Sequence, residues 1–267
     1  MFAKDVQVGK IKDILFDDLS LVLRYFVVDI SGWLPSKKLL VTPDSLMEIS
    51  HAAKRVTFNL NEEELKEAPP LSSDLPVSRQ YEQSLYQYWG LSPYWVAPSA
   101  GGAWFPYPEY TYSQNMRNWQ LKNLPARWKE ILDNRNECFD NHLRSAKEVS
   151  GYKITTSDSE KFGEVEDLIF DTDGGILIDM ILTSRKWLSG GKQFALSPLF
   201  INKINEQEKY LDVALTKPTL INSPEFKIEN YGKDYRRSLV EHYLANLSLE
   251  TTRMKKSQNR TSVGADL

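Results

Sequence analysis

Two clusters of aspartates carry side chains that could bind a cation. They are Asp13, Asp17 and Asp18 in the first half of the chain, and Asp167, Asp171 and Asp173 in the second. The run Asp171-Thr172-Asp173-Gly174 is like the start of a calcium-binding loop, but no Asp or Asn stands at the next odd position and no Glu at the twelfth. Aspartates in hairpin turns accept hydrogen bonds from their own backbone. We therefore predict turns at these positions and no metal site.

Motifs of known catalytic chemistry are missing from the sequence. The three histidines, His51, His142 and His242, lie far apart, and Cys138 with His142 makes only one isolated pair of potential metal ligands. No G-x-S-x-G nucleophile motif occurs, and the glycine pairs 101–102 and 174–175 lack the frame of a phosphate-binding loop. The sequence thus predicts a protein that is not an enzyme and that has no cofactor.

The most unusual stretch is residues 89–112, which is rich in aromatic and proline side chains. Long loops in compact domains are usually functional or disordered, and disordered segments contain few aromatic residues. Two interpretations stay open. The segment packs on the protein's own sheets, or it docks a partner through aromatic anchors, which concentrate binding energy at interfaces. The candidate partner-binding residues are Trp95, Trp104, Phe105, Tyr107 and Tyr110.

Composition limits the partners and the compartment. The 267-residue chain has a formal net charge of −3, which disfavours nucleic acid because phosphate binding usually needs a basic face. The single cysteine, Cys138, cannot form an intrachain disulfide, as expected outside oxidising compartments. The N-terminus lacks the apolar run of a signal peptide, and no stretch is long and apolar enough for a membrane helix. We expect a cytoplasmic protein without membrane insertion.

The sequence repeats itself, and the repeat predicts the elements that hold these residues. Residues 9–17, GKIKDILFD, match residues 163–171, GEVEDLIFD. A Trp-Leu pair follows each of them at the same distance, and we expect its tryptophans, Trp33 and Trp187, to pack in the core. Alternating apolar residues and glycine-containing turns predict short strands, as in a small barrel or sandwich. Each half then ends in a helix.

The repeat divides the chain into four segments. They are a first half over residues 1–89, a central segment with a linking helix over 90–141, a second half over 142–247, and a flexible tail over 248–267. Residues 151–158 are additional in the second half, so the first half is expected to lack an opening strand. An unpaired sheet edge must be covered, and the N-terminal residues, the central segment or another protomer are the alternatives.

These motifs are similar to those of a known family. The G-x-[IV]-x-D-[IL]-[IL]-F-D opening, the Trp-Leu pair, the [ST]-Pro dipeptide and the leader 142–149 resemble the PRC-barrel family, named after the cytoplasmic barrel of the photosynthetic reaction centre H subunit. The resemblance implies a mainly β chain with added helices, and two tandem small β-barrels in a bacterial protein. The family also includes a ribosome-maturation factor, and in both relatives the barrel is an adaptor rather than a catalyst.

The resemblance leads to three hypotheses about function. The first is a non-enzymatic adaptor or assembly protein that binds a protein partner, not yet identified, through the barrel faces and the central aromatic segment. The second is a sensor of a small ligand or ion, with a pocket between the two barrels, since pockets are common at domain interfaces. The third is an accessory factor in RNA processing or ribosome maturation, which needs a basic face. A homo-oligomer is also left open.

Overall fold

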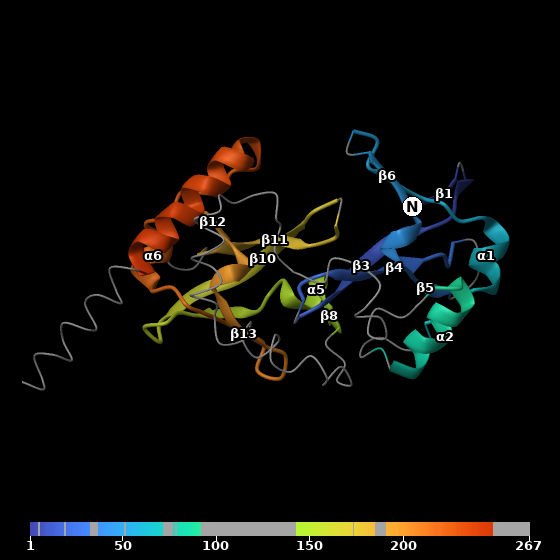
Figure 1. Cartoon of the computed structure of the whole chain (residues 1–267), viewed down its shortest axis with the longest axis horizontal. Coiled ribbons are helices and arrows are strands. Elements are labelled where there is room, and N and C mark those ends of the chain that lie inside the picture. Colours follow the sequence, from blue (N-terminus) through green and yellow to red (C-terminus); the bar gives the residue numbers. More distant parts are fainter. Residues whose placement is uncertain are drawn as a thin grey trace, which may run out of the picture. The chain divides into compact units, whose positions relative to one another are not determined.

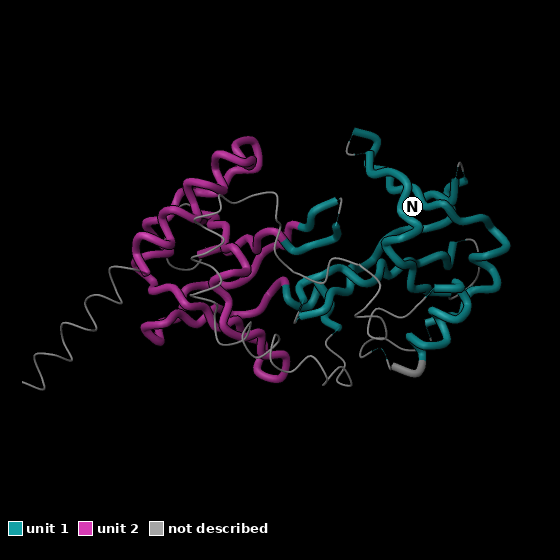
Figure 2. The backbone as a smooth tube through the Cα atoms, in the orientation of Figure 1, with its two compact units in different colours: residues 1–112, 128–149, 170–177 teal, residues 113–127, 150–169, 178–267 magenta. Residues whose placement is uncertain are grey.

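The computed structural model describes residues 1–91 and 143–247, except residues 5, 19, 33–36, 51, 72–76, 78, 173 and 185–190. Strands dominate these residues and several helices accompany them (Figure 1), which confirms the prediction of a mainly β protein with added helices. The chain divides into two compact units (Figure 2). Of the described residues, unit 1 contains 1–91, 143–149 and 170–177, and unit 2 contains 150–169 and 178–247.

Unit 2 is organised around a six-stranded sheet with the order β12-β11-β10-β9-β14-β13. Its strands are β9 (Lys153–Thr155), β10 (Lys161–Phe170), β11 (Leu177–Thr183), β12 (Gln193–Leu196), β13 (Ile201–Asn205) and β14 (Tyr210–Val213). The ends of β10 and β11 that meet at their hairpin turn belong to unit 1. Its helical elements are η2 (Pro198–Phe200), α6 (Lys217–Ile221), η3 (Ile228–Asn230) and a helix over residues 233–247.

The core of unit 2 lies between this sheet and the helix 233–247. The rings of Phe162 and Phe194 pack edge to face with centroids 5.3 Å apart, and both are almost fully buried. Tyr243 from the helix packs on Phe200 at 5.0 Å and donates a hydrogen bond to the Ala195 carbonyl at 2.6 Å. Aromatic side chains bury a large apolar area, so these contacts hold the helix to the sheet.

Unit 1 contains two four-stranded sheets, β2-β1-β7-β6 and β5-β4-β3-β8. Their strands are β1 (Phe2–Ala3), β2 (Val6–Gln7), β3 (Lys10–Asp17), β4 (Leu23–Asp29), β5 (Lys38–Val41), β6 (Leu46–Ser50), β7 (Arg55–Phe58) and β8 (Leu143–Ser145). Its helical elements are η1 (Pro43–Ser45), α1 (Glu62–Glu67), α2 (Arg79–Trp89) and α5 (Ala146–Val149). Tandem closed barrels are not confirmed, because the strand orders of the described residues run between open edges and no sheet closes on itself.

Strand pairing follows the same register in both units. Phe26 of β4 lies opposite Val41 of β5, and Met180 of β11 lies opposite Leu196 of β12. The β6–β7 and β13–β14 hairpins each shift register after their first pair, and each turn holds a lysine with positive φ, Lys54 at 48° and Lys209 at 52°. These are the positions that the sequence repeat aligns.

The expectation that the first half lacks an opening strand is wrong. Phe2 and Ala3 form β1, which pairs parallel with β7 and antiparallel with β2. β9 has the same two relations, parallel to β14 and antiparallel to β10. The N-terminal residues therefore cover this edge. A strand of two residues carries no alternating pattern. The sequence AKDV of residues 3–6 is also similar to AKEV of residues 146–149, which form the helix α5, so comparison of the two halves does not reveal β1.

Glycine at the start of the repeated motif allows two backbone segments to approach closely. A Cβ atom on Gly163 would lie 2.1 Å from the Thr183 carbonyl oxygen, and one on Gly9 would lie 2.3 Å from that of Asp29. Both distances are far below van der Waals contact. The repeated motif thus needs glycine here for packing of the first strand on the end of the second.

The helix that follows each sheet is held by the same hydrogen bond. The Tyr81 hydroxyl donates to the Pro69 carbonyl at 2.9 Å, and the Tyr235 hydroxyl donates to the Pro224 carbonyl at 3.1 Å. Burial raises the pKa of Tyr81 to about 12, so this hydroxyl keeps its proton throughout the physiological range. The bond fixes the start of the helix relative to the turn that precedes it.

Candidate functional site

The acidic residues at the hairpin turns bond to the backbone around them. The Asp17 carboxylate accepts hydrogen bonds from the Ser20 backbone N–H at 2.6 Å and from the Ser20 hydroxyl at 2.9 Å. Asp171 accepts one from the Gly174 N–H at 3.1 Å, and Asp173 lies outside the described residues. These bonds confirm the prediction of backbone-bonded turns at Asp17 and Asp171. Within the described ranges, no group of His, Cys, Asp or Glu is arranged to hold a metal ion.

Asp13 of β3 and Asp18, which follows that strand, hold the segment β8–α5 on the outer edge of β3. The Asp13 carboxylate accepts hydrogen bonds from the Ser145 hydroxyl at 2.5 Å and from the Lys147 N–H at 3.1 Å. Arg144 Nε lies 2.9 Å from Asp18 Oδ2, and both side chains are largely buried. This edge therefore recognises an extended segment by combining backbone pairing with carboxylate acceptors. Binding of β8–α5 by these aspartates was not predicted from the sequence. The one sequence signal for it was the recurrence of Asp13 as Asp167 in the second copy of the motif.

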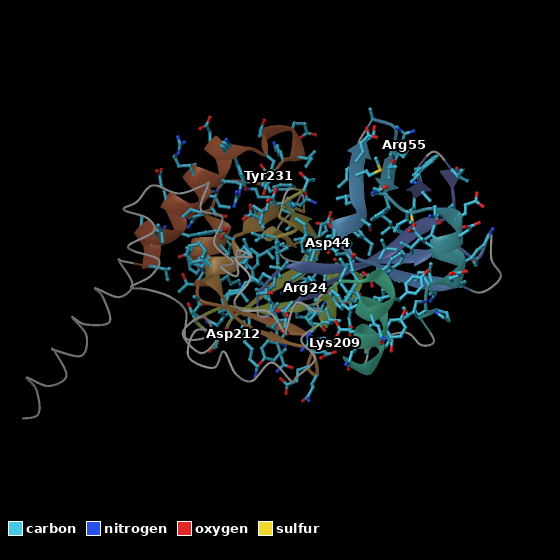
Figure 3. The ribbon with its side chains drawn as sticks, turned by 45° about the vertical axis from the view of Figure 1, so that its right-hand side comes forward. Arg24, Asp44, Arg55, Lys209, Asp212 and Tyr231 are labelled. Carbon is cyan, nitrogen blue, oxygen red and sulfur yellow. The ribbon has the colours of Figure 1, made fainter. Side chains whose placement is uncertain are left out.

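A buried carboxylate ties β11 to the helix 233–247 in unit 2. Asp179 is 1% exposed, and its Oδ2 accepts hydrogen bonds from the Tyr231 hydroxyl at 2.6 Å and from Arg236 Nε at 2.9 Å; Tyr231 is labelled in Figure 3. Desolvation raises the pKa of Asp179 above its usual 3.8, while Arg236 and Tyr231 act in the opposite direction. Since two donors occupy the carboxylate, the arrangement fixes the helix and does not present an acid to a substrate.

Unit 1 has a polar contact at the corresponding place, with the roles reversed. Tyr25 of β4 donates from its hydroxyl to the Glu82 carboxylate of α2 at 2.8 Å, and both side chains are fully buried. Tyr86 packs edge-on against Tyr25, with ring centroids 6.2 Å apart. Burial raises the pKa of Tyr86 to about 12, and the charge of Glu82 contributes to the same shift. Here the helix supplies the carboxylate, whereas in unit 2 the strand supplies it.

Two exposed apolar side chains of unit 1 lie on the two edge strands of one sheet. Met47 on β6, an edge strand, is 61% exposed, and Val6 on β2 is 47% exposed. Arg55 of β7, labelled in Figure 3, lies 3.5 Å from the Glu48 carboxylate and 5.3 Å from the centre of the Phe2 ring. Edge strands with apolar side chains are places where partner chains add to a sheet.

Most sequence-predicted site residues lie outside the described residues. These are the five aromatic candidates, Trp95, Trp104, Phe105, Tyr107 and Tyr110, together with Trp33, Trp187, Cys138, His51 and His142. Of the three histidines, His242 is the one within the described part of the chain. Its Nε2 lies 2.9 Å from the Thr219 carbonyl oxygen, so it links the helix 233–247 to α6. This contact joins two helices of unit 2.

Comparison with known families identifies the part of the chain that contains β8 to β14. Residues 142–220 match the PRC-barrel domain. This confirms the resemblance inferred from the sequence, over the segment that includes the leader β8–α5 and the six strands of unit 2's sheet. PRC-barrel domains are generally non-catalytic and often take part in protein interactions. No curated protein matches the chain. No helix in the described ranges is both long and apolar enough to cross a membrane.

Proposed function

We propose that this chain is a non-catalytic adaptor that brings a protein partner to a pair of PRC-barrel modules. The match of residues 142–220 to the PRC-barrel domain carries the proposal, because such domains often act in protein interactions. The buried charged groups support it, since Asp179 and Glu82 each take part in a contact that joins a strand to a helix. We place the adaptor in the bacterial cytoplasm, in keeping with its single cysteine.

The proposal includes a second PRC-type module in residues 1–89. Three observations support it: the repeated motif, the equal strand registers, and β1 in the position of β9. In this arrangement residues 1–89 and 142–247 are tandem small barrels, each followed by a helix. Residues 90–141 join them and residues 248–267 are a tail. Two modules in one chain present twice the docking surface and raise avidity for a partner with two matching sites.

The docking surface that we propose combines the central aromatic segment with the exposed strands of unit 1. Aromatic anchors dominate the energetics of protein interfaces. The proposed anchors are Trp95, Trp104, Phe105, Tyr107 and Tyr110. Val6 and Met47 are proposed as further contacts, because they are exposed apolar side chains on the two edge strands of one sheet.

Capture of the partner by the purified chain tests the adaptor function. The intact chain is compared with a variant in which Trp95, Trp104 and Tyr107 are changed to alanine, and circular dichroism verifies that both are folded. We expect the intact chain to retain a protein that the variant loses, and the purified partner to bind the intact chain at least tenfold more tightly. A second variant, Met47→Ser, removes apolar area from β6 alone and tests the part of the proposed docking surface that lies on the sheet.

Equal capture by the intact chain and the triple variant would show that the aromatic segment packs on its own protein. Loss of capture in Met47→Ser alone would place the docking surface on the sheet. Failure of every form to retain a protein would count against the adaptor function itself.

A further inference from the structure

The outer edge of β3 shows how this fold accepts an additional strand. β8 pairs antiparallel with β3, with Leu15 opposite Ser145 and Asp17 opposite Leu143. With β8 in place, Leu15 and Phe16 are fully buried. Ser145 and Lys147 then reach the carboxylate of Asp13, as described above. Backbone pairing supplies affinity in such strand addition, and the side-chain contacts supply selectivity.

The equivalent edge of β10 has no such strand among the described residues. β9 pairs with Lys161 to Glu164, and the Val165 N–H then donates to the Tyr152 carbonyl at 2.9 Å. The β9–β10 register runs to Glu164, and in the strand order of the described residues the neighbours of β10 are β9 and β11. Ile169, which takes the place of Leu15 in the repeated motif, is only partly buried. The backbone groups of this edge thus lie beside an apolar side chain that a further strand would cover.

Asp167 on this edge has the local conformation of Asp13. The carboxylate of Asp13 accepts the N–H of Ile14 at 2.8 Å, and that of Asp167 accepts the N–H of Leu168 at 2.8 Å. Asp13 also receives the hydroxyl and amide of the β8–α5 segment. Asp167 receives no second hydrogen bond in the described structure, and its side chain is exposed to solvent. An acceptor already held in its bound conformation loses little entropy on binding.

We propose that the outer edge of β10, residues 167–169, binds an extended segment of a partner protein that carries serine or threonine opposite Ile169. The segment pairs antiparallel with β10, and its hydroxyl and a following backbone N–H bond to Asp167. The carboxylate selects hydroxyl and amide donors and repels acidic segments. This inference rests on the proposed adaptor function and specifies one class of partner segment for it.

Binding of a peptide to the full-length chain tests the proposal. The probe is a fluorescent peptide with the chain's own residues 141–149, NHLRSAKEV, because it contains the serine and the amide that bond to Asp13. Fluorescence anisotropy gives its affinity for the intact chain, for Asp167→Ala and for Asp13→Ala. We expect Asp167→Ala to weaken binding by about ten- to a hundredfold, the effect of losing hydrogen bonds to a charged acceptor, and Asp13→Ala to leave it unchanged.

A changed peptide provides the matched control. Replacement of its serine by alanine should weaken binding to the intact chain to a similar degree, and should cause no further loss with Asp167→Ala. Three outcomes would overturn the proposal. The peptide does not bind, or its binding depends on Asp13 because it displaces β8. In the third, the chain forms dimers that Asp167→Ala dissociates, which would mean that a second copy occupies the edge. Each of these leaves the capture experiment unaffected, so a failure here is distinguishable from a failure of the adaptor function.

Discussion

At the scale of single residues, both units join a strand to the following helix through a buried hydrogen bond, but the donor and the acceptor are exchanged. A strand and the following helix must be joined across a buried contact, and in unit 1 a tyrosine on β4 donates to a glutamate on α2. In unit 2 an aspartate on β11 accepts from an arginine on the helix 233–247. A buried polar group must be paired, but either partner can be the acceptor. The contact is therefore maintained while its residue types differ.

The pair Asp179–Arg236 gives a prediction for stability. Arg236→Leu leaves the Asp179 carboxylate buried without its cation, which should destabilise the protein by about 3–5 kcal/mol at pH 7. The matched control is Arg237→Leu, because Arg237 is exposed and its ion pair with Asp234 is exposed too. This control should change stability by about 0.5 kcal/mol or less. Urea unfolding of the full chain measures both.

The Asp179 carboxylate also makes the free energy of unfolding depend on pH. Burial raises the folded-state pKa of Asp179 above its unfolded value of 3.8. Its stabilising contribution is therefore present at low pH and is lost as pH rises from about 3.8 through the folded pKa. Removal of Arg236 raises that pKa further, so the cost of Arg236→Leu should shrink as pH falls from 7 toward 4.5. An equal cost at both pH values would show that the charge of Asp179 plays no part.

At the scale of elements, local sequence pattern was sufficient for the long strands and insufficient for the short ones. β3 and β10 alternate polar and apolar residues in their first parts and carry three consecutive apolar residues near their ends, and the repeat of this pattern predicted equivalent positions. β1 and β8 have two and three residues, too few for a period to be visible. The site formed by β8 on β3 joins residues 132 positions apart in the chain. Such a contact depends on tertiary packing, which no local pattern encodes.

Equivalent aspartates on β3 and β10 should differ in their contribution to stability. Asp13→Ala removes the acceptor of the Ser145 hydroxyl and the Lys147 amide and should destabilise the chain by about 1–3 kcal/mol. Asp167→Ala, at the same position of the motif, should cost about 0.5 kcal/mol or less because its side chain is exposed. Thermal or urea unfolding compares the two, and equal costs would contradict the role assigned to β8.

At the scale of the whole molecule, the second half of the sequence completes unit 1. β8 adds the fourth strand to the sheet β5-β4-β3-β8. Residues 170–177 also belong to unit 1, where Leu23 N–H donates to the Gly175 carbonyl at 2.7 Å and Leu177 N–H to that of Leu21 at 2.8 Å. The rings of Phe16 and Phe170 pack edge to face at 5.8 Å. A boundary drawn at residue 142 from the repeat therefore does not coincide with the boundary of the compact unit.

This shared construction predicts the behaviour of a divided chain. Residues 1–141 and 142–267, produced together as separate polypeptides, should purify as one complex because strands from both form unit 1. Leu143→Asp in the second fragment places a charge at a buried position and should weaken the complex at least tenfold. Size-exclusion chromatography with mass analysis measures both. Separate elution of two folded fragments would mean that the pairing of β8 contributes little.

The carboxylate of the strand–helix contact is on the helix in unit 1 and on the strand in unit 2. If duplication produced the two halves as proposed, this difference limits the order of the substitutions by which they diverged. Conversion of one pair into the other takes two substitutions, and one of them must come first. An aspartate opposite a glutamate would bury two carboxylates together, which is strongly unfavourable. A tyrosine opposite an arginine leaves a hydroxyl oxygen that accepts from the guanidinium. Of the two intermediates, tyrosine on the strand with arginine on the helix keeps a hydrogen bond across the contact and avoids two facing carboxylates, so it is the less unfavourable one.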